Sequence, residues 1–151
     1  MDICSCTNDE IENLNEPLFR LICHCSTCRS YTGADFFDEC TFLLKDSESL
    51  SLDKVDFKTY QSGFSPMKRG RCNECGKVSY STIRVWPFPK FVMLPTAAIR
   101  NKNIKKPFAH LYYKSRVIDI DDSVRKINSH FVSQLFIQFN IIRSLLARRF
   151  K

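Results

Sequence analysis

The sequence has no long hydrophobic run, since no apolar stretch reaches the roughly 18 residues that a membrane-spanning helix needs. We therefore expect no transmembrane segment and a soluble protein. We also expect no signal segment, because the acidic start Met1-Asp2-Ile3-Cys4 is not apolar. Internal repeats and low-complexity segments are also absent. Eight cysteines without a signal segment are expected in a reducing compartment, by default the cytoplasm, where thiols stay free to bind metal.

Cysteine is the residue that the sequence has in unusual number. Seven of the eight cysteines fall into three tight groups, whereas a disulfide framework would spread them along the chain. The groups are Cys4 with Cys6, Cys23 with Cys25 and Cys28, and Cys72 with Cys75. Thiolates bind zinc either in closed structural sites with four ligands or in sites with three protein ligands and an open position. The seven cysteines therefore divide naturally into four and three.

The first and last groups together predict a structural zinc site. Residues i and i+2 of an extended chain point to the same side, so Cys4 and Cys6 can reach one ion. Cys72 and Cys75 enclose a tight turn, and Gly76 can supply the positive φ that such a turn often needs. An ion held by both pairs would connect segments about 65 residues apart and would contribute directly to folding.

The middle group has no obvious fourth ligand, which predicts a zinc site with an open position for a substrate thiol or a water. Its ligands in this interpretation are Cys23, Cys25 and Cys28. On an extended chain His24 points away from its two cysteine neighbours and is therefore the poorer ligand. Two alternatives stay open: a structural site completed by His24 or a distant residue, and a redox pair of Cys25 and Cys28.

Several stretches of the sequence are similar to one known family. They are Cys-His-Cys-Ser-Thr-Cys-Arg-Ser-Tyr-Thr-Gly-Ala at 23–34, the upstream Cys-x-Cys pair, Cys-Asn-Glu-Cys-Gly at 72–76, and residues 110–115 with the acidic pair at 121–122. Over roughly residues 3–127 the chain resembles the glutathione-dependent formaldehyde-activating enzyme family, which includes centromere protein V. The resemblance implies a zinc-binding β-tent fold with one structural and one catalytic zinc. The residues matching the structural site are Cys4, Cys6, Cys72 and Cys75, and those matching the catalytic site are Cys23, Cys25 and Cys28.

The resemblance also implies carbon–sulfur bond chemistry, in which formaldehyde and glutathione combine to S-hydroxymethylglutathione, or the reverse. We interpret the protein as a zinc-dependent carbon–sulfur lyase with two zinc ions per chain and a small thiol such as glutathione as partner. Arg29 is the candidate for binding a carboxylate of the thiol, although a surface salt bridge would use this side chain equally well. The alternative is a zinc-stabilised binding module without turnover that contacts protein or nucleic acid.

Positive charge is in excess, with a formal net charge of +7. Metal binding deprotonates cysteines, so seven thiolates and two zinc ions would lower this charge to about +4. The basic runs at 100–106 and 143–151 are typical of solvated faces, and no RNA-type aromatic motif is present, so we expect no nucleic-acid partner. Lys68, Arg69 and Arg71 are expected to offset the charge of the neighbouring four-cysteine site, unless they form a solvated basic turn.

Alternation of apolar and polar residues predicts a mainly β domain of antiparallel sheets. The expected strands are 17–22, 35–44, 55–61, 78–86, 90–94 and 108–113, separated by turn formers. Cys40 stands alone in one of these strands and is expected to be a small buried hydrophobe.

The apolar spacing changes to three and four from about Ser129, which predicts an added C-terminal amphipathic helix. We assign residues 1–127 to the zinc-binding domain and residues 128–151 to a helical extension. The helix is expected to cover the β core. Its alternatives are the contact of a homodimer and a basic helix on a membrane surface.

Overall fold

A computed structural model describes residues 2–6, 14, 16–47, 50–59, 66–84, 86–99 and 104–149 of the protein. The strands are β1 (Phe19–Cys23), β2 (Phe37–Leu43), β3 (Val55–Lys58), β4 (Met67–Cys72), β5 (Val78–Ile83), β6 (Phe91–Pro95) and β7 (His110–Leu111). The helices are α2 (Ser26–Thr32) and α3 (His130–Arg149), and 3-10 turns cover Leu44–Asp46, Leu52–Lys54, Thr96–Ala98 and Tyr113–Ser115.

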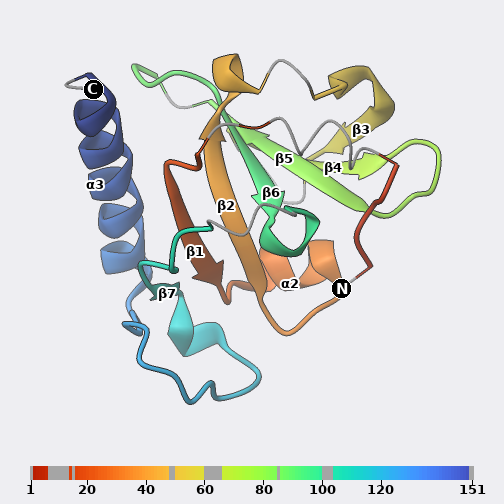
Figure 1. Cartoon of the computed structure of the whole chain (residues 1–151). Helices are drawn as coiled ribbons and strands as arrows, with labels where there is room; N and C mark the ends of the chain where they lie inside the picture. Colours follow the sequence, from red (N-terminus) through yellow and green to blue (C-terminus); the bar gives the residue numbers. More distant parts are fainter. Residues whose placement is uncertain are drawn as a thin grey trace.

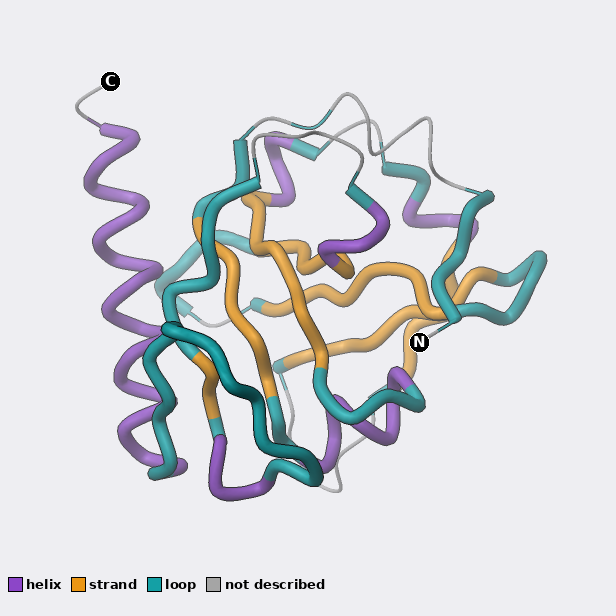
Figure 2. The backbone as a smooth tube through the Cα atoms, turned by 60° about the horizontal axis from the view of Figure 1, so that its bottom comes forward, coloured by secondary structure: helices purple, strands orange, loops and turns teal. Residues whose placement is uncertain are grey.

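The seven strands form one sheet in the order β3-β4-β5-β6-β2-β1-β7, with α3 along one side (Figure 1). Every neighbouring pair is antiparallel except β1 and β7, which run parallel, so the sheet is mixed. The tube drawing shows from a second direction that the long helix lies beside the strands (Figure 2). The predicted mainly β fold with a C-terminal helix is therefore confirmed.

Six described strands lie within or beside the predicted stretches, and β4 and α2 are additional. Strand β4 occupies the segment in which a basic turn was the alternative, because pairing with β3 and β5 on both sides fixes it as a strand. Helix α2 begins where the sulfur of Cys25 accepts a hydrogen bond from the backbone N–H of Cys28, and it ends at Gly33 with φ 66°. The predicted strand end at 60–61 and the helix end at 150–151 lie outside the described residues.

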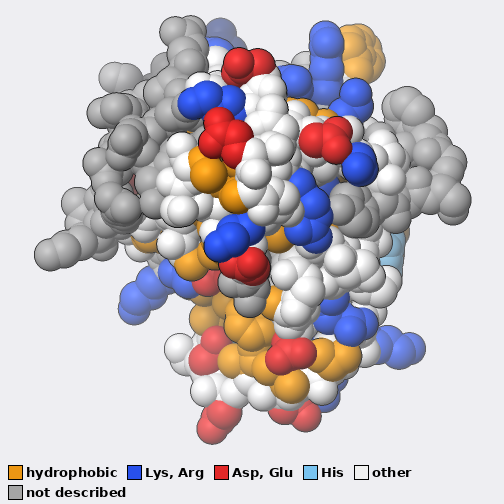
Figure 3. Space-filling view, turned by 90° about the vertical axis from the view of Figure 1, so that its right-hand side faces the viewer, with side chains coloured by type: hydrophobic (Ala, Val, Ile, Leu, Met, Phe, Trp, Pro, Cys, Tyr) orange, Lys and Arg blue, Asp and Glu red, His pale blue; other side chains and the backbone are white. Residues whose placement is uncertain are grey.

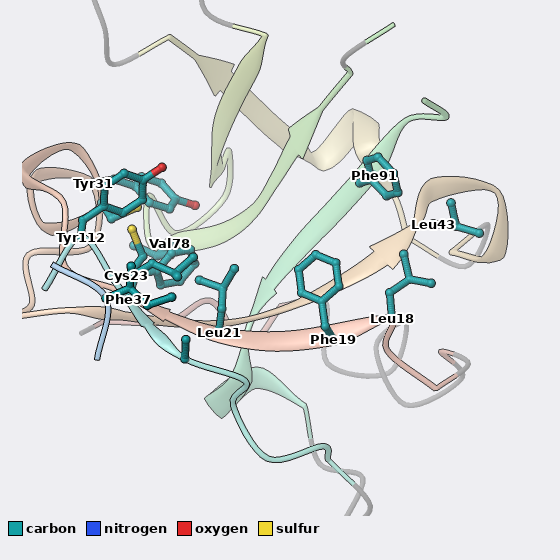
Figure 4. Close-up of a cluster of buried hydrophobic side chains, with 14 residues drawn as sticks. Leu18, Phe19, Leu21, Cys23, Tyr31, Phe37, Leu43, Val78, Phe91 and Tyr112 are labelled. Carbon is teal, nitrogen blue, oxygen red and sulfur yellow. The ribbon is translucent and has the colours of Figure 1, made fainter. Parts of the chain in front are cut away.

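Apolar side chains cover both faces of the sheet. One cluster contains Leu21, Phe37 and Phe91, and Figure 4 shows Leu21 and Phe37 near Cys23 and Phe91 farther along the sheet. The other cluster contains Phe42 and Leu94 together with Cys40, which is completely buried as predicted.

Helix α3 packs one face against the first of these clusters, as the sequence predicted. Phe136, Ile137, Ile141 and Leu145 make this contact. Polar bonds fix the helix at both ends: Ser133 Oγ accepts from the backbone N–H of Tyr112 at 2.9 Å, and Arg148 pairs with Asp46. The helix therefore belongs to the folded body of the protein.

The outer face of α3 is also apolar. Its exposed large side chains are Phe131, Val132, Leu135, Phe139, Ile142 and Leu146. Within the described residues, no helix is both long and apolar enough to cross a membrane. The homodimer contact and the membrane-surface contact through this face stay predictions.

Lysine and arginine side chains are interspersed with aspartate and glutamate on the face that Figure 3 turns to the viewer. Ion pairs among the described residues include Lys58 with Asp56 on β3 and Lys77 with Asp2 near the N-terminus. This face of the described part of the chain therefore offers no continuous basic surface of the kind that binds nucleic acid. The absence of a nucleic-acid partner stays a prediction.

Gly70 predicts one stability effect. A Cβ atom placed there would clash with a methyl group of Val55 and would lie 2.5 Å from the carbonyl oxygen of Tyr80. Gly70→Ala is therefore expected to lower the free energy of unfolding by about 3 kcal/mol or more, because backbone on a paired strand cannot move aside. Gly33→Ala is the control, since a Cβ atom at this position would meet nothing within 4 Å. This substitution should lower the free energy of unfolding by only about 1 kcal/mol, because the residue has a positive φ. Denaturant unfolding measures both, and equal losses would contradict the packing argument.

Candidate metal centres and the adjoining cavity

The first candidate centre joins the N-terminal segment to the turn after β4. Ile3 forms a parallel bridge with Val78, and the backbone N–H of Cys4 donates to the carbonyl of Val78 at 2.8 Å. The turn after Cys72 closes at Gly76, which has φ 69° as its position predicted. The four sulfur atoms all lie within 4.8 Å of one another; they belong to Cys4, Cys6, Cys72 and Cys75. The structure thus brings together the four cysteines that the sequence grouped.

The second candidate centre lies where β1 passes into α2. Cys23 is the last residue of β1, Cys25 caps the start of α2, and Cys28 lies in its first turn. Their three sulfurs lie within 4.8 Å of one another, and Cys25 is only half-buried while the other two are buried. No fourth histidine, cysteine or carboxylate of the described residues joins this group. The three cysteines that could hold a metal ion therefore come from one short segment.

Both sulfur sets fit zinc. Zinc binds cysteine sulfur at about 2.3 Å, so the sulfurs of a tetrahedral site lie about 3.8 Å apart. The separations are 3.5 Å between the sulfurs of Cys23 and Cys25 and 3.6 Å between those of Cys75 and Cys4. In the absence of metal, hydrogen bonds with Cys23 and Cys28 hold the pKa of Cys25 well below its usual range, and the bond with Cys25 raises the pKa of Cys23. Metal binding would release the protons that such thiols still hold.

A cavity of about 500 Å³ adjoins the three-cysteine group. Its lining includes all three of these cysteines, apolar side chains of the sheet, and residues of α3. A larger groove of about 690 Å³ runs between α3 and the start of β1, but no cysteine lines it. The smaller cavity is therefore the one that adjoins a candidate metal centre.

A family model described as glutathione-dependent formaldehyde-activating enzyme matches residues 2–115. The chain belongs to this family. The matched region includes all seven grouped cysteines and ends in the 3-10 turn before Asp122 and α3. The resemblance in the sequence is thereby confirmed. A search of curated proteins found no match.

Glu39 also lines this cavity, and it was not identified from the sequence as a candidate site residue. It lies on β2 among the residues that line the cavity, and only 7% of it is exposed. Among the described residues its carboxyl group has electrostatic neighbours, chiefly Arg69, but no hydrogen-bond partner. Burial raises the pKa of Glu39 to about 8, although the positive charge of Arg69 acts in the opposite direction. A carboxyl group that is neutral at pH 7 can donate a proton inside the cavity.

Arg69 was expected beside the four-cysteine group but lies at the three-cysteine group. Its guanidinium is buried and donates to the sulfur of Cys28 at 3.1 Å and to the sulfur of Met67 at 2.8 Å. Arg71, one full period further along β4, instead donates to the carbonyl of Gly76 in the four-cysteine turn at 3.1 Å. Arg69 therefore contacts the three-cysteine group, and Arg71 contacts the turn of the four-cysteine group.

Two buried histidines hold the segment that carries Cys23 and Cys25. The Nε2 atom of His24 lies 2.9 Å from the Nδ1 atom of His110, whose Nε2 atom lies 2.9 Å from a carboxylate oxygen of Asp122. Burial lowers the pKa of His24 to about 4, and the hydrogen bond with His110 lowers the pKa of Asp122 to about 2. His24 thus points toward His110 and does not join the sulfur group.

Arg29 lies one turn into α2, where its backbone N–H donates to the carbonyl of Cys25 at 3.1 Å. Its Nε atom is buried and has no hydrogen-bond partner among the described residues. Arg29 is not among the residues that line the cavity. Its role in substrate binding stays a prediction.

Proposed function

We propose that the protein is a zinc-dependent carbon–sulfur lyase that makes or breaks the bond between a thiol sulfur and an aldehyde carbon. Glutathione and formaldehyde are the reactants that the family description names. The observation that carries the proposal is the position of Cys23, Cys25 and Cys28, which line the same cavity as the buried side chain of Glu39. Sulfur binding and proton transfer thereby become possible in one space.

The protein would hold one zinc ion at each cysteine group. Cys4, Cys6, Cys72 and Cys75 form a closed set, which suits a structural ion. A zinc ion bound by Cys23, Cys25 and Cys28 would supply a Lewis-acid position for the substrate sulfur. Arg69 fixes Cys28 in place by its hydrogen bond and offsets part of the thiolate charge.

Glu39 would carry the proton of the reaction. When the adduct forms, the thiol has lost its proton, its sulfur bonds to the carbonyl carbon, and the carbonyl π electrons move to the oxygen, which takes a proton from Glu39. Solvent returns the proton of the thiol to Glu39, so that thiol plus aldehyde gives the hydroxyalkyl thioether and nothing else. In the reverse direction Glu39 accepts the hydroxyl proton while the carbon–sulfur bond breaks and its electron pair leaves with the sulfur.

Removal of the more weakly held metal tests this assignment. We expect two zinc ions per chain, of which a moderate chelator removes one readily, because a site with three protein ligands exchanges its metal faster than a closed one. Turnover of glutathione and formaldehyde should disappear with the first ion and return when zinc is added. Elemental analysis measures the zinc content, circular dichroism checks that the fold persists, and an assay for S-hydroxymethylglutathione measures turnover.

Cys40→Ser is the matched control for thiol chemistry, since Cys40 is completely buried and lies outside both groups. It should retain both ions and full turnover. A protein that binds a single tight zinc and never forms the adduct would contradict the lyase and favour a binding module. The cytoplasmic location stays a prediction from the sequence.

A further inference from the structure

The cavity at the three-cysteine group has far more apolar wall than a one-carbon aldehyde can cover. Formaldehyde adds a single carbon to a thiol, whereas a cavity of about 500 Å³ falls in the range of about 300–1,000 Å³ that surrounds drug-sized ligands. We propose that the substrate is a thiol–aldehyde adduct that carries an apolar group, and that this group lies in the cavity between the sheet and α3. The inference rests on the proposed lyase function and names its substrate class.

Apolar side chains line the cavity both from the sheet and from α3, which also contributes the polar residues His130, Gln134 and Gln138. Leu21, Phe91 and Met93 line it from the sheet, and Figure 4 shows Leu21 and Phe91 on the side of the sheet that carries Cys23. Ile137 and Ile141 line it from α3. An alkyl or aryl group between these side chains would be removed from water on both of its faces. This burial is favourable in proportion to the apolar area covered. Methionine side chains adapt to groups of different shape, so a range of apolar groups would fit.

The charges in the cavity do not suit the whole of a charged tripeptide. Glutathione carries two carboxylates and one ammonium group, and burying such charges without partners is costly. Arg69 is the one arginine or lysine among the described lining residues, and its guanidinium already bonds the sulfurs of Cys28 and Met67. Glu39 is the one carboxylate among them. If the thiol is glutathione, its charged ends therefore lie at the mouth of the cavity in water, and the apolar group occupies the interior.

Helix α3 makes this preference a property of this chain. The family match ends at residue 115, whereas α3 begins at His130. Besides its two isoleucines, the helix contributes Gln134, whose amide donates to the hydroxyl of Tyr112 at 2.6 Å and so fixes another lining residue. The wall that would select the apolar group thus comes from a segment beyond the matched family region.

Stable thioethers test the inference without turnover. For the zinc-loaded full chain, calorimetry should show that S-hexylglutathione binds at least about tenfold more tightly than S-methylglutathione, because each buried methylene improves affinity by up to about fourfold. The heat capacity change should be more negative for the hexyl compound. If the apolar group comes from the thiol and not from the aldehyde, hexyl methyl sulfide should bind and S-hexylglutathione should not. Equal affinities for S-methylglutathione and both hexyl compounds would overturn the inference.

Two substitutions on α3 locate the binding surface. Ile141→Gln should reduce the ratio of hexyl to methyl affinity about tenfold or more, because it puts a polar amide into the apolar wall. Leu146→Gln is the matched control on the outer face of the same helix, where the leucine is 51% exposed, and the ratio should stay unchanged. Identical effects of the two substitutions would contradict the proposed location. A protein that prefers the hexyl compound but forms no adduct would refute the lyase and leave this binding site in place.

Discussion

Cys75→Ser is expected to prevent stable folding, with a melting temperature at least about 15 °C lower than that of the unchanged protein. Cys75 supplies one of four sulfurs that join the N-terminal segment to the turn between β4 and β5. Structural zinc sites contribute about 10–16 kcal/mol to the folding of small metal-binding domains. Since a whole domain is stable by only about 5–15 kcal/mol, loss of a fraction of this contribution is enough to unfold the protein.

Cys25→Ser is the comparison that gives this prediction its meaning. The three-cysteine group lies within one short segment, so its metal restricts little chain entropy. Serine can also cap α2 in place of Cys25. The variant should melt within a few degrees of the unchanged protein, retain one zinc ion, and lose adduct turnover. If it melts as early as Cys75→Ser, the division into a structural and a catalytic site is wrong.

Glu39→Gln should lower the rate of adduct formation by roughly 100- to 10,000-fold, the range over which a positioned acid or base contributes to catalysis. Glutamine keeps the shape of Glu39 but cannot give up a proton to the carbonyl oxygen. Zinc content should remain at two ions per chain, because the side chain belongs to neither sulfur group. Unchanged turnover with unchanged zinc would exclude Glu39 as the proton carrier.

The same substitution has a second readout in stability. The pKa of Glu39 is raised from 4.5 to about 8, so the folded state binds more protons than the unfolded state between these values. The free energy of unfolding of the unchanged protein should therefore fall from pH 5 to pH 8 relative to that of Glu39→Gln, by a difference on the order of 5 kcal/mol. Urea unfolding at saturating zinc measures it. Asp56→Asn is the control for the loss of a carboxylate as such, since the Asp56 side chain is 56% exposed on β3.

Cysteine spacing made both candidate centres predictable. The period-two spacing of Cys4 and Cys6, and the turn after Cys72, describe local geometry that a sequence specifies directly, and the sulfurs are where that geometry required. The closing of the four-cysteine group depended only on chemistry, because four thiolates are a complete zinc set. Helix α3 was predictable for the same local reason, since its apolar residues recur every three or four positions.

The cavity was not predictable, because it depends on which face each polar residue occupies. Strand β2 contains the adjacent acids Asp38 and Glu39, and the sequence does not say which of the two points inward. In the structure Asp38 pairs with Arg20, while Glu39 lies in the cavity. Arg69 was assigned to the wrong cysteine group for a related reason: the sequence does not show which way it points until pairing with β3 and β5 makes its segment a strand. Long-range pairing decided both positions.

The arrangement of the two cysteine groups sets an order of events during protein synthesis. A ribosome that adds about 5–20 residues per second makes residues 23–28 in roughly 0.3–1.2 s. At the same rate, roughly 3–14 s pass between the synthesis of Cys6 and that of Cys72 and Cys75. The group expected to hold zinc more weakly in the finished protein is therefore the first that can capture it in the growing chain. Strand β6, which lies between β5 and β2, is made later than both groups. Until Cys72 and Cys75 have been made, a growing chain can therefore complete a cysteine group only at residues 23–28, while its N-terminal segment is still unattached.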